Sequence, residues 1–529
     1  MKLDRNVALF SLLACLAGLA AADEGMWMPQ QIPTLAPRLA ALGFQGDPEA
    51  FADLTGQPMG AVVSLGGCSA SFVSPDGLIV TNHHCVVGAL QYNATPERNL
   101  LEEGFLARTR EEELPIGPGS RVHVTTEVSE VTGDLARRLT PELSDRERYD
   151  VVDRWVKART AACEKDGSRC RVSPFFGGLR WFEIRQLEIR DVRLVYAPAA
   201  GIGNFGGETD NWRWPRHTGD WSFYRAYVGK DGKPAPFSKE NVPYRPAHWL
   251  PVQPAGVEEG DLVFVVGYPG RTQRHQTWAE VKETAEWAFP RFVLGAQEQI
   301  AILEELGKTD PELKIKAAGR VRGLNNSLTN RKGQIDGLVK GGILARKEAN
   351  EKALAAWIAA DPARQKEMGD VLPALAALQA ESEKTRERDA AFQALFTSSS
   401  MLNAAHSAHL FAVERAKKKD VDRDPAYQER NWTRIREAQE RAQRTIDARL
   451  DKALLAWAMP QAAALPADQR IAGLDKLVGL TPGMTKADSD RAIAVYLERA
   501  FASTRMADKD FRLGLLGKTT AEIAAAKDP

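Results

Sequence analysis

The chain has 529 residues, of which 44% are apolar, and its 70 basic residues balance 70 acidic ones. This length predicts several domains with cores of their own, and the absence of net charge argues against nucleic acid as a partner. The sequence contains neither a Walker phosphate loop nor a G-x-G-x-x-G dinucleotide motif.

The first 22 residues have the features of a secretory signal peptide. Lys2 and Arg5 precede an apolar run over residues 7–21, and alanines at 20–22 offer a small-residue cleavage site. The run is short for a membrane span, and Leu13 fits a bacterial lipoprotein signal poorly. We therefore expect a periplasmic or secreted protein that has no membrane span once residues 1–22 are removed.

Cleavage would remove Cys15 and leave four cysteines, an even number that indicates two disulfides in an exported chain. Four cysteines allow three connectivities. Proximity favours Cys163 with Cys170, which flank the polar turn EKDGSR, and then Cys68 with Cys85.

Residues 23–271 have a pattern that is mostly typical of β-strands. Short runs rich in β-branched and aromatic residues are bounded by Gly, Pro or Asp. These runs are GAVVSLG, SASFV, GLIVT, RVHVTTEV, VRLVYA, WSFYRAYVG and LVFVVGYPG. The turn residues SPDG at 74–77 predict a hairpin between the second and third runs. A helix is expected over about 145–162.

The pattern changes to helical spacing over residues 272–529. The clearest helical segments are TWAEVKETAEWAF, FVLGAQEQIAILEEL, GQIDGLVKGGILARKEANEKALAAWIAA and RIREAQERAQRTIDARLDKALLAWA. Prolines punctuate this half at Pro290, Pro311, Pro362, Pro373 and Pro425. The sequence thus predicts an α+β protein, with a β-rich part followed by a large α-helical domain.

The segment TNHHCVVG places His83 and His84 directly before Cys85, after a predicted strand. A shared metal ion is disfavoured because adjacent side chains on a strand point to opposite faces and because an oxidised cysteine cannot supply a thiolate. The local sequence leaves open a buried structural pair and the general base of a serine peptidase.

The segment CSASFVSPDGLIVTNHHC resembles the histidine hairpin of chymotrypsin-like peptidases, in which the base immediately precedes a cysteine. By that resemblance His84 is the base and His83 has a structural role.

Longer motifs indicate a particular family among the chymotrypsin-like peptidases. The segments MWMPQQIP, DLTGQPMGAVVSLGGCSASFVSPDGLIVTNHHC, NLLEEGFLA, EELPIGPGSRVHVT and GGETDNWRWPRHTGDWSFYRAYV resemble the bacterial dipeptidyl-peptidase 7 and dipeptidyl-peptidase 11 family. These are exported serine exopeptidases that release dipeptides from peptide N-termini. The resemblance implies a chymotrypsin-like double β-barrel with a large helical domain, peptide substrates with a free N-terminus, a homodimer, and no metal or organic cofactor.

The family pattern implies roles for individual residues. Asp220, in PRHTGDW, occupies the place of the catalytic aspartate, and Asp210 in ETDNW is the rival carboxylate. Asn211, Trp212 and, on the helical domain, Asn326 match positions that hold the substrate's α-ammonium group.

One position departs from the family pattern, because Glu208 stands where the family usually has Asp. The exchange keeps a carboxylate, so we expect it to change little.

The nucleophile is missing from this pattern. The family places it in a glycine-rich loop such as G-N-S-G, but Ser222 and Ser238 lack glycine neighbours and the TSSS segment at 397–400 lies in a helical region. We therefore expect the chain to be C-terminally truncated, with an incomplete double barrel and no activity of its own. A non-catalytic exported peptide-binding protein and a chymotrypsin-like endopeptidase are the alternatives.

Overall fold

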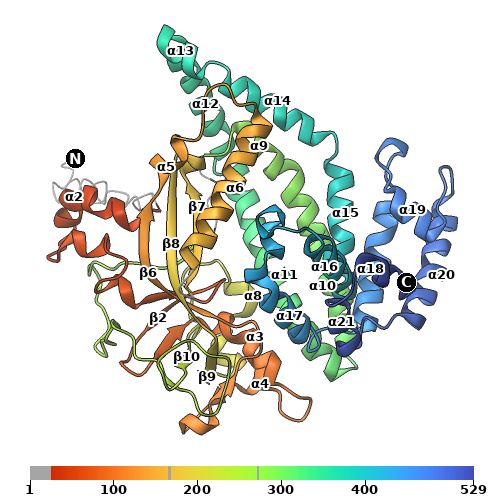
Figure 1. The fold of residues 1–529 in the computed structure, drawn as a ribbon, viewed down its shortest axis with the longest axis horizontal. Helices are drawn as coiled ribbons and strands as arrows, with labels where there is room; N and C mark the ends of the chain where they lie inside the picture. The colour runs from red at the N-terminus through yellow and green to blue at the C-terminus, as the bar shows by residue number, and fades with distance from the viewer. Residues whose placement is uncertain (1–25, 165–167, 271–272, 274) are drawn as a thin grey trace, which may run out of the picture.

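The computed structural model describes residues 26–164, 168–270, 273 and 275–529. One antiparallel sheet region and one helical region lie side by side, as Figure 1 shows, with the early helix α3 at their junction. This arrangement confirms the predicted change from a β-rich first part to a helical second part. The predicted signal peptide lies outside the described residues, and the predicted boundary between 271 and 272 falls at residues that are not described.

The sheet contains 11 strands among the described residues, in the order β4-β9-β10-β3-β2-β1-β6-β8-β7, with β11 beside β10 and β5 beside β9. The strands are β1 (Val62–Ser64), β2 (Ser69–Phe72), β3 (Leu78–Thr81), β4 (Phe105–Leu106), β5 (Leu114–Pro115), β6 (Val122–Glu130), β7 (Arg169–Phe175), β8 (Arg180–Ile189), β9 (Asp191–Ala197), β10 (Ser222–Val228) and β11 (Val242–Pro243). The helices of this part are α2 (Ala36–Ala41), α3 (His83–Asn93), α4 (Leu100–Glu103), α5 (Thr132–Ala136), α6 (Asp145–Cys163), α7 (Ala200–Gly203) and α8 (Gly207–Asp210).

The predicted hairpin between β2 and β3 is present, and its turn chemistry is the expected one. The hydroxyl of Ser74 accepts hydrogen bonds from the backbone N–H groups of Asp76 and Leu78, both at 3.2 Å. Gly77 adopts a φ of +70°, which a residue with a side chain rarely adopts. The hairpin fixes the register that delivers the end of β3 to the site described below.

The helical region begins with α9, and the five prolines named in the sequence analysis lie at or near helix starts, where a missing N–H costs nothing. Pro460 is different, because it lies inside the helix over residues 448–463. Pro311 and Pro362 are the first residues of their helices. The helices are α9 (Trp278–Glu283), α10 (Phe289–Gly307), α11 (Pro311–Val339), α12 (Ile343–Ala359), α13 (Pro362–Met368), α14 (Val371–Glu383), α15 (Arg386–Ser398), α16 (Ser400–Arg415), α17 (Trp432–Ala442), α18 (Ala448–Ala463), α19 (Ala472–Val478), α20 (Lys486–Ser503), α21 (Lys509–Leu515) and α22 (Thr520–Ala525).

Two segments with continuous helical spacing are each divided into two helices. Between α11 and α12, Gly342 adopts a φ of +68° and starts a new helix. Between α17 and α18, the carboxylate of Asp447 accepts from the N–H of Arg449 and caps α18. Apolar periodicity continues across both breaks, so the spacing alone did not reveal them.

The β-rich part and the helical region share a core. Buried side chains of the sheet and α3, such as Phe72, Ile79 and Leu90, pack in one cluster with Ile315 of α11. The Gln91 amide of α3 donates to the Ile315 carbonyl at 2.6 Å. Helix α11 is therefore held against α3, the helix that begins with the two histidines.

The predicted strand over residues 262–270 is wrong. A strand needs a neighbour to accept and donate its ladder hydrogen bonds, and within the described residues none pairs with this segment. Instead, Phe264 stacks on Phe51, with ring centroids 4.6 Å apart. The N–H of Tyr268 donates to the hydroxyl of Ser69 at 2.7 Å, which ties the end of the segment to β2.

Both predicted disulfides are present. Cys68 is joined to Cys85, with Cα atoms 6.2 Å apart, and Cys163 is joined to Cys170, with Cα atoms 6.0 Å apart. Such bonds are typical of exported proteins. In the described part of the chain, no helix is long and apolar enough to cross a membrane.

Replacing Cys68 and Cys85 together by serine is expected to lower the free energy of unfolding by about 3 kcal/mol. The disulfide joins two residues 17 positions apart, and this loop restricts the conformations of the unfolded chain. Urea unfolding of the two proteins measures this difference, and peptide mapping of the non-reduced protein should recover both bonds. Free thiols at Cys68 and Cys85 in the purified protein would contradict the predicted pairing.

Candidate active site

Strand register brings His84 and Asp220 together. Strands β3 and β10 are antiparallel, and Ser222, the first residue of β10, lies opposite Thr81, the last residue of β3. The chain leaving β3 and the chain entering β10 therefore lie at the same edge of the ladder. His84 follows Thr81 by three residues and Asp220 precedes Ser222 by two, so both enter the same corner.

Asp220 holds His84 at two points. Its Oδ2 lies 2.9 Å from the His84 Nδ1, and its Oδ1 accepts the His84 backbone N–H at 3.0 Å. The side-chain amide of Asn82 also donates to Asp220 Oδ2, at 3.3 Å. An ionised carboxylate can only accept, so Nδ1 carries the proton and Nε2 is left as the acceptor. The predicted contact with Asp220, rather than with Asp210, is confirmed.

Asp220 remains ionised in this setting. Burial is the largest influence and raises the pKa of the carboxyl, but the hydrogen bonds from the His84 side chain and backbone, with the charges of His84 and Arg216, lower the pKa to about 2. The Asp220 side chain is 15% exposed, whereas the His84 ring is 51% exposed. The pair thus has a buried anchor and an accessible ring.

The two histidines begin helix α3 and do not continue a strand, which corrects the expected placement. Successive residues on a helix also point to different faces, so the two histidine rings still point in different directions, as expected. His83 is 2% exposed, and neither of its ring nitrogens has a hydrogen-bond partner. A Cβ added to Gly203 would lie 2.5 Å from the His83 ring, so only glycine fits against it. These contacts agree with a structural role for His83.

The burial of His83 predicts a pH-dependent stability. Burial, followed by the charge of Arg322, lowers the pKa of His83 from 6.5 to about 4. The unfolded chain binds this proton more readily, so stability is greatest above pH 6.5 and falls as the pH drops to 4, by about 3 kcal/mol from this group. Urea unfolding between pH 7.5 and 4 should show a smaller loss for His83→Leu than for the parent protein. The exposed His217 is a matched control: His217→Leu should keep the full loss, and an equal loss in His83→Leu would contradict the assignment.

Three groups with the chemistry of metal ligands lie together at this corner. Ligand atoms of Cys68, Cys85 and His84 are within 4.8 Å of one another. Both sulfurs are joined in the disulfide and cannot act as thiolates. The same bond fixes Cys85, the residue after His84, to the loop before β2.

The residues expected to hold a substrate amine also come together. The side-chain amide of Asn211 donates to the Oδ1 of Asn326 at 3.1 Å, and the indole N–H of Trp212 donates to the same Oδ1 at 3.0 Å. Asn326 lies on α11, more than a hundred residues along the chain. The cluster therefore spans the β-rich part and the helical region.

Two features of this cluster were not apparent from the sequence. Glu208 accepts a hydrogen bond from the Asn211 amide at 3.0 Å, so its carboxylate belongs to the cluster. Trp212 has a φ of +61°, a strained conformation for a residue with a side chain, of the kind that is concentrated at functional sites. The charge of Arg322 interacts with both Asp220 and Glu208, which links the two groups electrostatically.

Within the described residues, no serine is hydrogen-bonded to the His84 ring. The hydroxyl of Ser222 is buried in β10 without a partner. Ser238 accepts a backbone N–H from Glu240 in a turn. In the TSSS segment, Ser399 is buried and caps α16, and its hydroxyl donates to Asp451 at 2.7 Å.

Comparison with known proteins gives a family. The Peptidase S46 model matches residues 22–529. An Asp/Glu-specific dipeptidyl-peptidase of Shewanella putrefaciens is 37% identical over 525 residues, which are 99% of this chain and 70% of that protein. A dipeptidyl-peptidase 7 of Capnocytophaga gingivalis is 36% identical over 372 residues, which are 69% of this chain and 52% of that protein.

A solved structure supports the same relationship. The crystal structure of Porphyromonas endodontalis DPP11 in complex with dipeptide Arg-Glu matches with a TM-score of 0.73 and 28% identity, over 95% of this chain and 73% of that one. The fold and the family resemblance expected from the sequence are thereby confirmed. The chain belongs to the peptidase S46 family.

Proposed function

We propose that the chain carries the base, the orienting acid and the substrate-amine site of an exported serine dipeptidyl-peptidase. The observation that carries this proposal is the 2.9 Å contact between His84 Nδ1 and Asp220, which leaves Nε2 free to accept a proton. The names of the relatives, both dipeptidyl-peptidases, support the reaction type.

In the proposed mechanism, His84 Nε2 takes the proton of a serine hydroxyl as that oxygen attacks the scissile carbonyl. The imidazolium then protonates the leaving amine, and the acyl-enzyme is hydrolysed by a water that His84 deprotonates in turn. Asp220 keeps Nδ1 protonated and stabilises the imidazolium. With its pKa near 2, Asp220 stays ionised through the neutral and mildly acidic range.

We further propose that the cluster of Asn211, Trp212, Asn326 and Glu208, here named the amine clasp, binds the substrate's α-ammonium group. An ammonium group donates three hydrogen bonds and needs acceptors. The hydrogen bonds of the Asn211 side chain to Glu208 and Asn326 both use its NH₂ group, so its Oδ1 remains available, and Glu208 adds a negative charge beside it. If the clasp holds the N-terminus at a fixed distance from His84, the bond that lies beside His84 is the one after the second residue.

The nucleophile, in this proposal, is none of the serines of the chain. Support comes from the lack of a glycine-flanked serine motif and from the contacts of Ser222, Ser238 and Ser399 described above. A non-catalytic peptide-binding protein would keep the same clasp, and an endopeptidase would not need it.

The relative that matches 99% of this chain is named Asp/Glu-specific. On that support we propose that the second residue of the substrate, before the cleaved bond, is acidic. Export to an oxidising compartment is supported by the two disulfides, and N-terminal sequencing of the exported protein tests cleavage after Ala22. The homodimer stays a prediction that sedimentation can test.

The test is the product pattern from an octapeptide with a free N-terminus, analysed by mass spectrometry. The chain is assayed alone and joined to the C-terminal segment of the Shewanella relative, in which the family resemblance predicts the glycine-flanked serine. We expect dipeptides, released in steps of two from the N-terminus, only from the joined protein. Internal cleavage that also occurs in an N-acetylated octapeptide would favour the endopeptidase, and binding without cleavage by the joined protein would favour the binding protein.

A further inference from the structure

A cavity of about 550 Å³ opens beside His84, between the β-rich part and helix α17. Its size is within the range of pockets that hold one or two amino-acid residues. One wall is the Cys68–Cys85 disulfide with the loop before it, and the opposite wall is α17. The lining includes Gly66, Cys68, His84, Arg121, Arg434 and Arg441.

The amine clasp is not part of this cavity. His84 lines the cavity, but Asn211, Trp212 and Asn326 do not. In the proposed reaction the two residues before the cleaved bond lie between the clasp and His84, and His84 protonates the amine of the third residue. A cavity that borders His84 but not the clasp is therefore positioned to hold the third and following residues, which leave as the product peptide.

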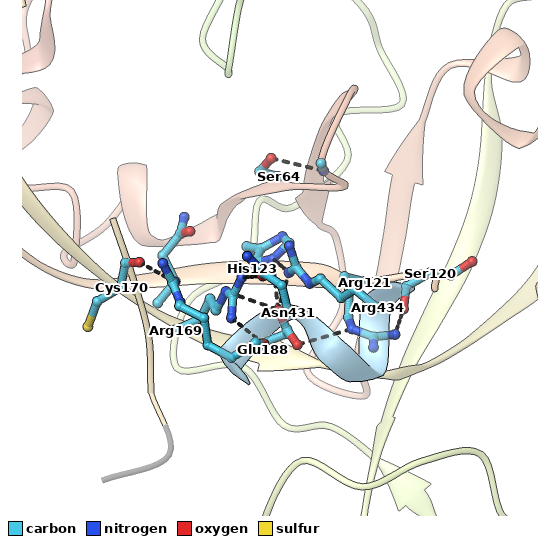
Figure 2. Close-up of polar contacts among 12 residues, drawn as sticks. Ser64, Ser120, Arg121, His123, Arg169, Cys170, Glu188, Asn431 and Arg434 are labelled. Carbon is cyan, nitrogen blue, oxygen red and sulfur yellow. Dashed lines mark hydrogen bonds and ion pairs between the residues drawn. The ribbon is translucent and has the colours of Figure 1, made fainter. Parts of the chain in front are cut away.

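The cavity wall carries an excess of positive charge. Three guanidinium groups line it, from Arg121, Arg434 and Arg441, and no carboxylate does. Figure 2 shows Glu188 among Arg121, Arg434 and His123. Glu188 accepts from Arg121 at 3.1 Å and also contacts Arg434, and Glu437 accepts from Arg121 at 2.5 Å. Two carboxylates thus stand behind three lining arginines.

Arg441 is the cation without an ionic partner. Its guanidinium donates to the carbonyls of Ile116 at 2.8 Å and Gly88 at 3.0 Å, and to the Ser120 hydroxyl at 3.2 Å. Within the described residues no carboxylate pairs with it. A fixed guanidinium in a partly enclosed site favours an incoming carboxylate, by charge and by paired hydrogen bonds.

We propose that this cavity is a subsite for the leaving peptide, and that Arg441 gives it a preference for Asp or Glu as the third residue of the substrate. The proposal rests on the function proposed above, because the clasp sets which residue reaches the cavity. It concerns the residue after the cleaved bond and is separate from the preference for the residue before it.

Calorimetry on the whole chain carrying Asp220→Asn, which prevents cleavage during the titration, tests this subsite. The ligands are tetrapeptide amides with free N-termini that differ only at the third residue, Asp, Asn or Lys, in two series with Asp or Leu second. We expect Asp to bind about tenfold more tightly than Asn, a difference of about 1.4 kcal/mol, with Lys weakest. The dipeptide amide lacking a third residue should bind without dependence on Arg441. Equal affinity for Asp, Asn and Lys would overturn the proposal.

Variants assign the preference to one residue. Arg441→Met should abolish the tenfold difference between Asp and Asn, whereas Arg441→Lys should keep most of it. Arg444→Met is the matched control, because Arg444 is exposed three residues further on and does not line the cavity. If Arg441→Met does not fold by circular dichroism, Arg434→Gln replaces it and should reduce the difference. A difference that persists in a folded Arg441→Met protein would overturn the assignment.

The proposed function can fail separately in the same experiment. If N-acetylated tetrapeptides bind as tightly as free ones, the amine clasp is wrong. If free N-termini are required but the third residue has no effect, only the leaving-peptide subsite is wrong.

Discussion

Replacing His84 by alanine is expected to reduce dipeptide release at least about 10⁴-fold, because the serine then has no base and the leaving amine no acid. Asp220→Asn should cost about 10⁴-fold, since an amide at this position can donate to Nδ1 and so favours the wrong tautomer of His84. Both effects are measured as kcat/KM in the chain joined to the C-terminal segment of the Shewanella relative. The 2.9 Å contact between the two side chains is the basis for expecting similar losses.

Two control variants test whether the loss of activity is specific to His84 and Asp220. His217→Ala removes an exposed histidine that makes no hydrogen bond to any described residue, and Asp210→Ala removes the rival carboxylate; both should retain most of the activity. Activity of the chain without the added segment, lost on His84→Ala, would show that one of its own serines is the nucleophile. Full activity of Asp220→Asn would remove Asp220 from the mechanism.

Loss of the amine clasp is expected to have the second largest effect. A hydrogen bond to a charged group is worth about 1.5–3 kcal/mol, so Asn211→Ala should weaken binding of a free N-terminus about 10- to 100-fold. Asn326→Ala should cost at least as much, because the Asn326 Oδ1 accepts from both Asn211 and Trp212 and holds the clasp together. Acetylation of the peptide's N-terminus should reproduce the loss in the parent protein.

The neighbouring Asn325 offers a matched control for the clasp. It is the same residue type on the same helix, and it makes no hydrogen bond to Asn211 or Trp212. Asn325→Ala should bind the free peptide like the parent protein. If Asn326→Ala and Asn325→Ala bind alike, or if acetylation has no effect in the parent, the clasp does not recognise the α-ammonium group.

The contact between His84 and Asp220 could be predicted because long motifs surround both residues and because the hairpin turn residues define the strand that leads to His84. Asn82, which follows the β-branched run, is the N-cap of α3 and a residue type that often starts helices, but its side chain makes no capping hydrogen bond. One such residue in the sequence did not outweigh the strand pattern before it. The sequence does not predict the contact of Glu208 with the Asn211 amide, because that contact depends on the short helix α8, which places the two side chains together. The cavity was likewise hidden, because its walls come from residues more than three hundred positions apart.

The segment 262–270 is a case in which the sequence predicts an element that the structure does not contain. Its composition is that of a buried strand, but composition does not specify a pairing partner, and its phenylalanine packs on Phe51 instead. Similarly, apolar spacing continued through Gly342 and Asp447, where a left-handed residue and a capping carboxylate start new helices.

A crystal structure of the Asp220→Asn chain soaked with a free N-terminal tetrapeptide tests the central claim most directly. The account predicts the α-ammonium group within hydrogen-bond distance of Asn211 Oδ1 and Glu208. It also predicts the bond after the second residue beside His84 Nε2 and the third side chain in the cavity facing Arg441. A peptide bound with its N-terminus away from the clasp, or with a different bond beside His84, would contradict it.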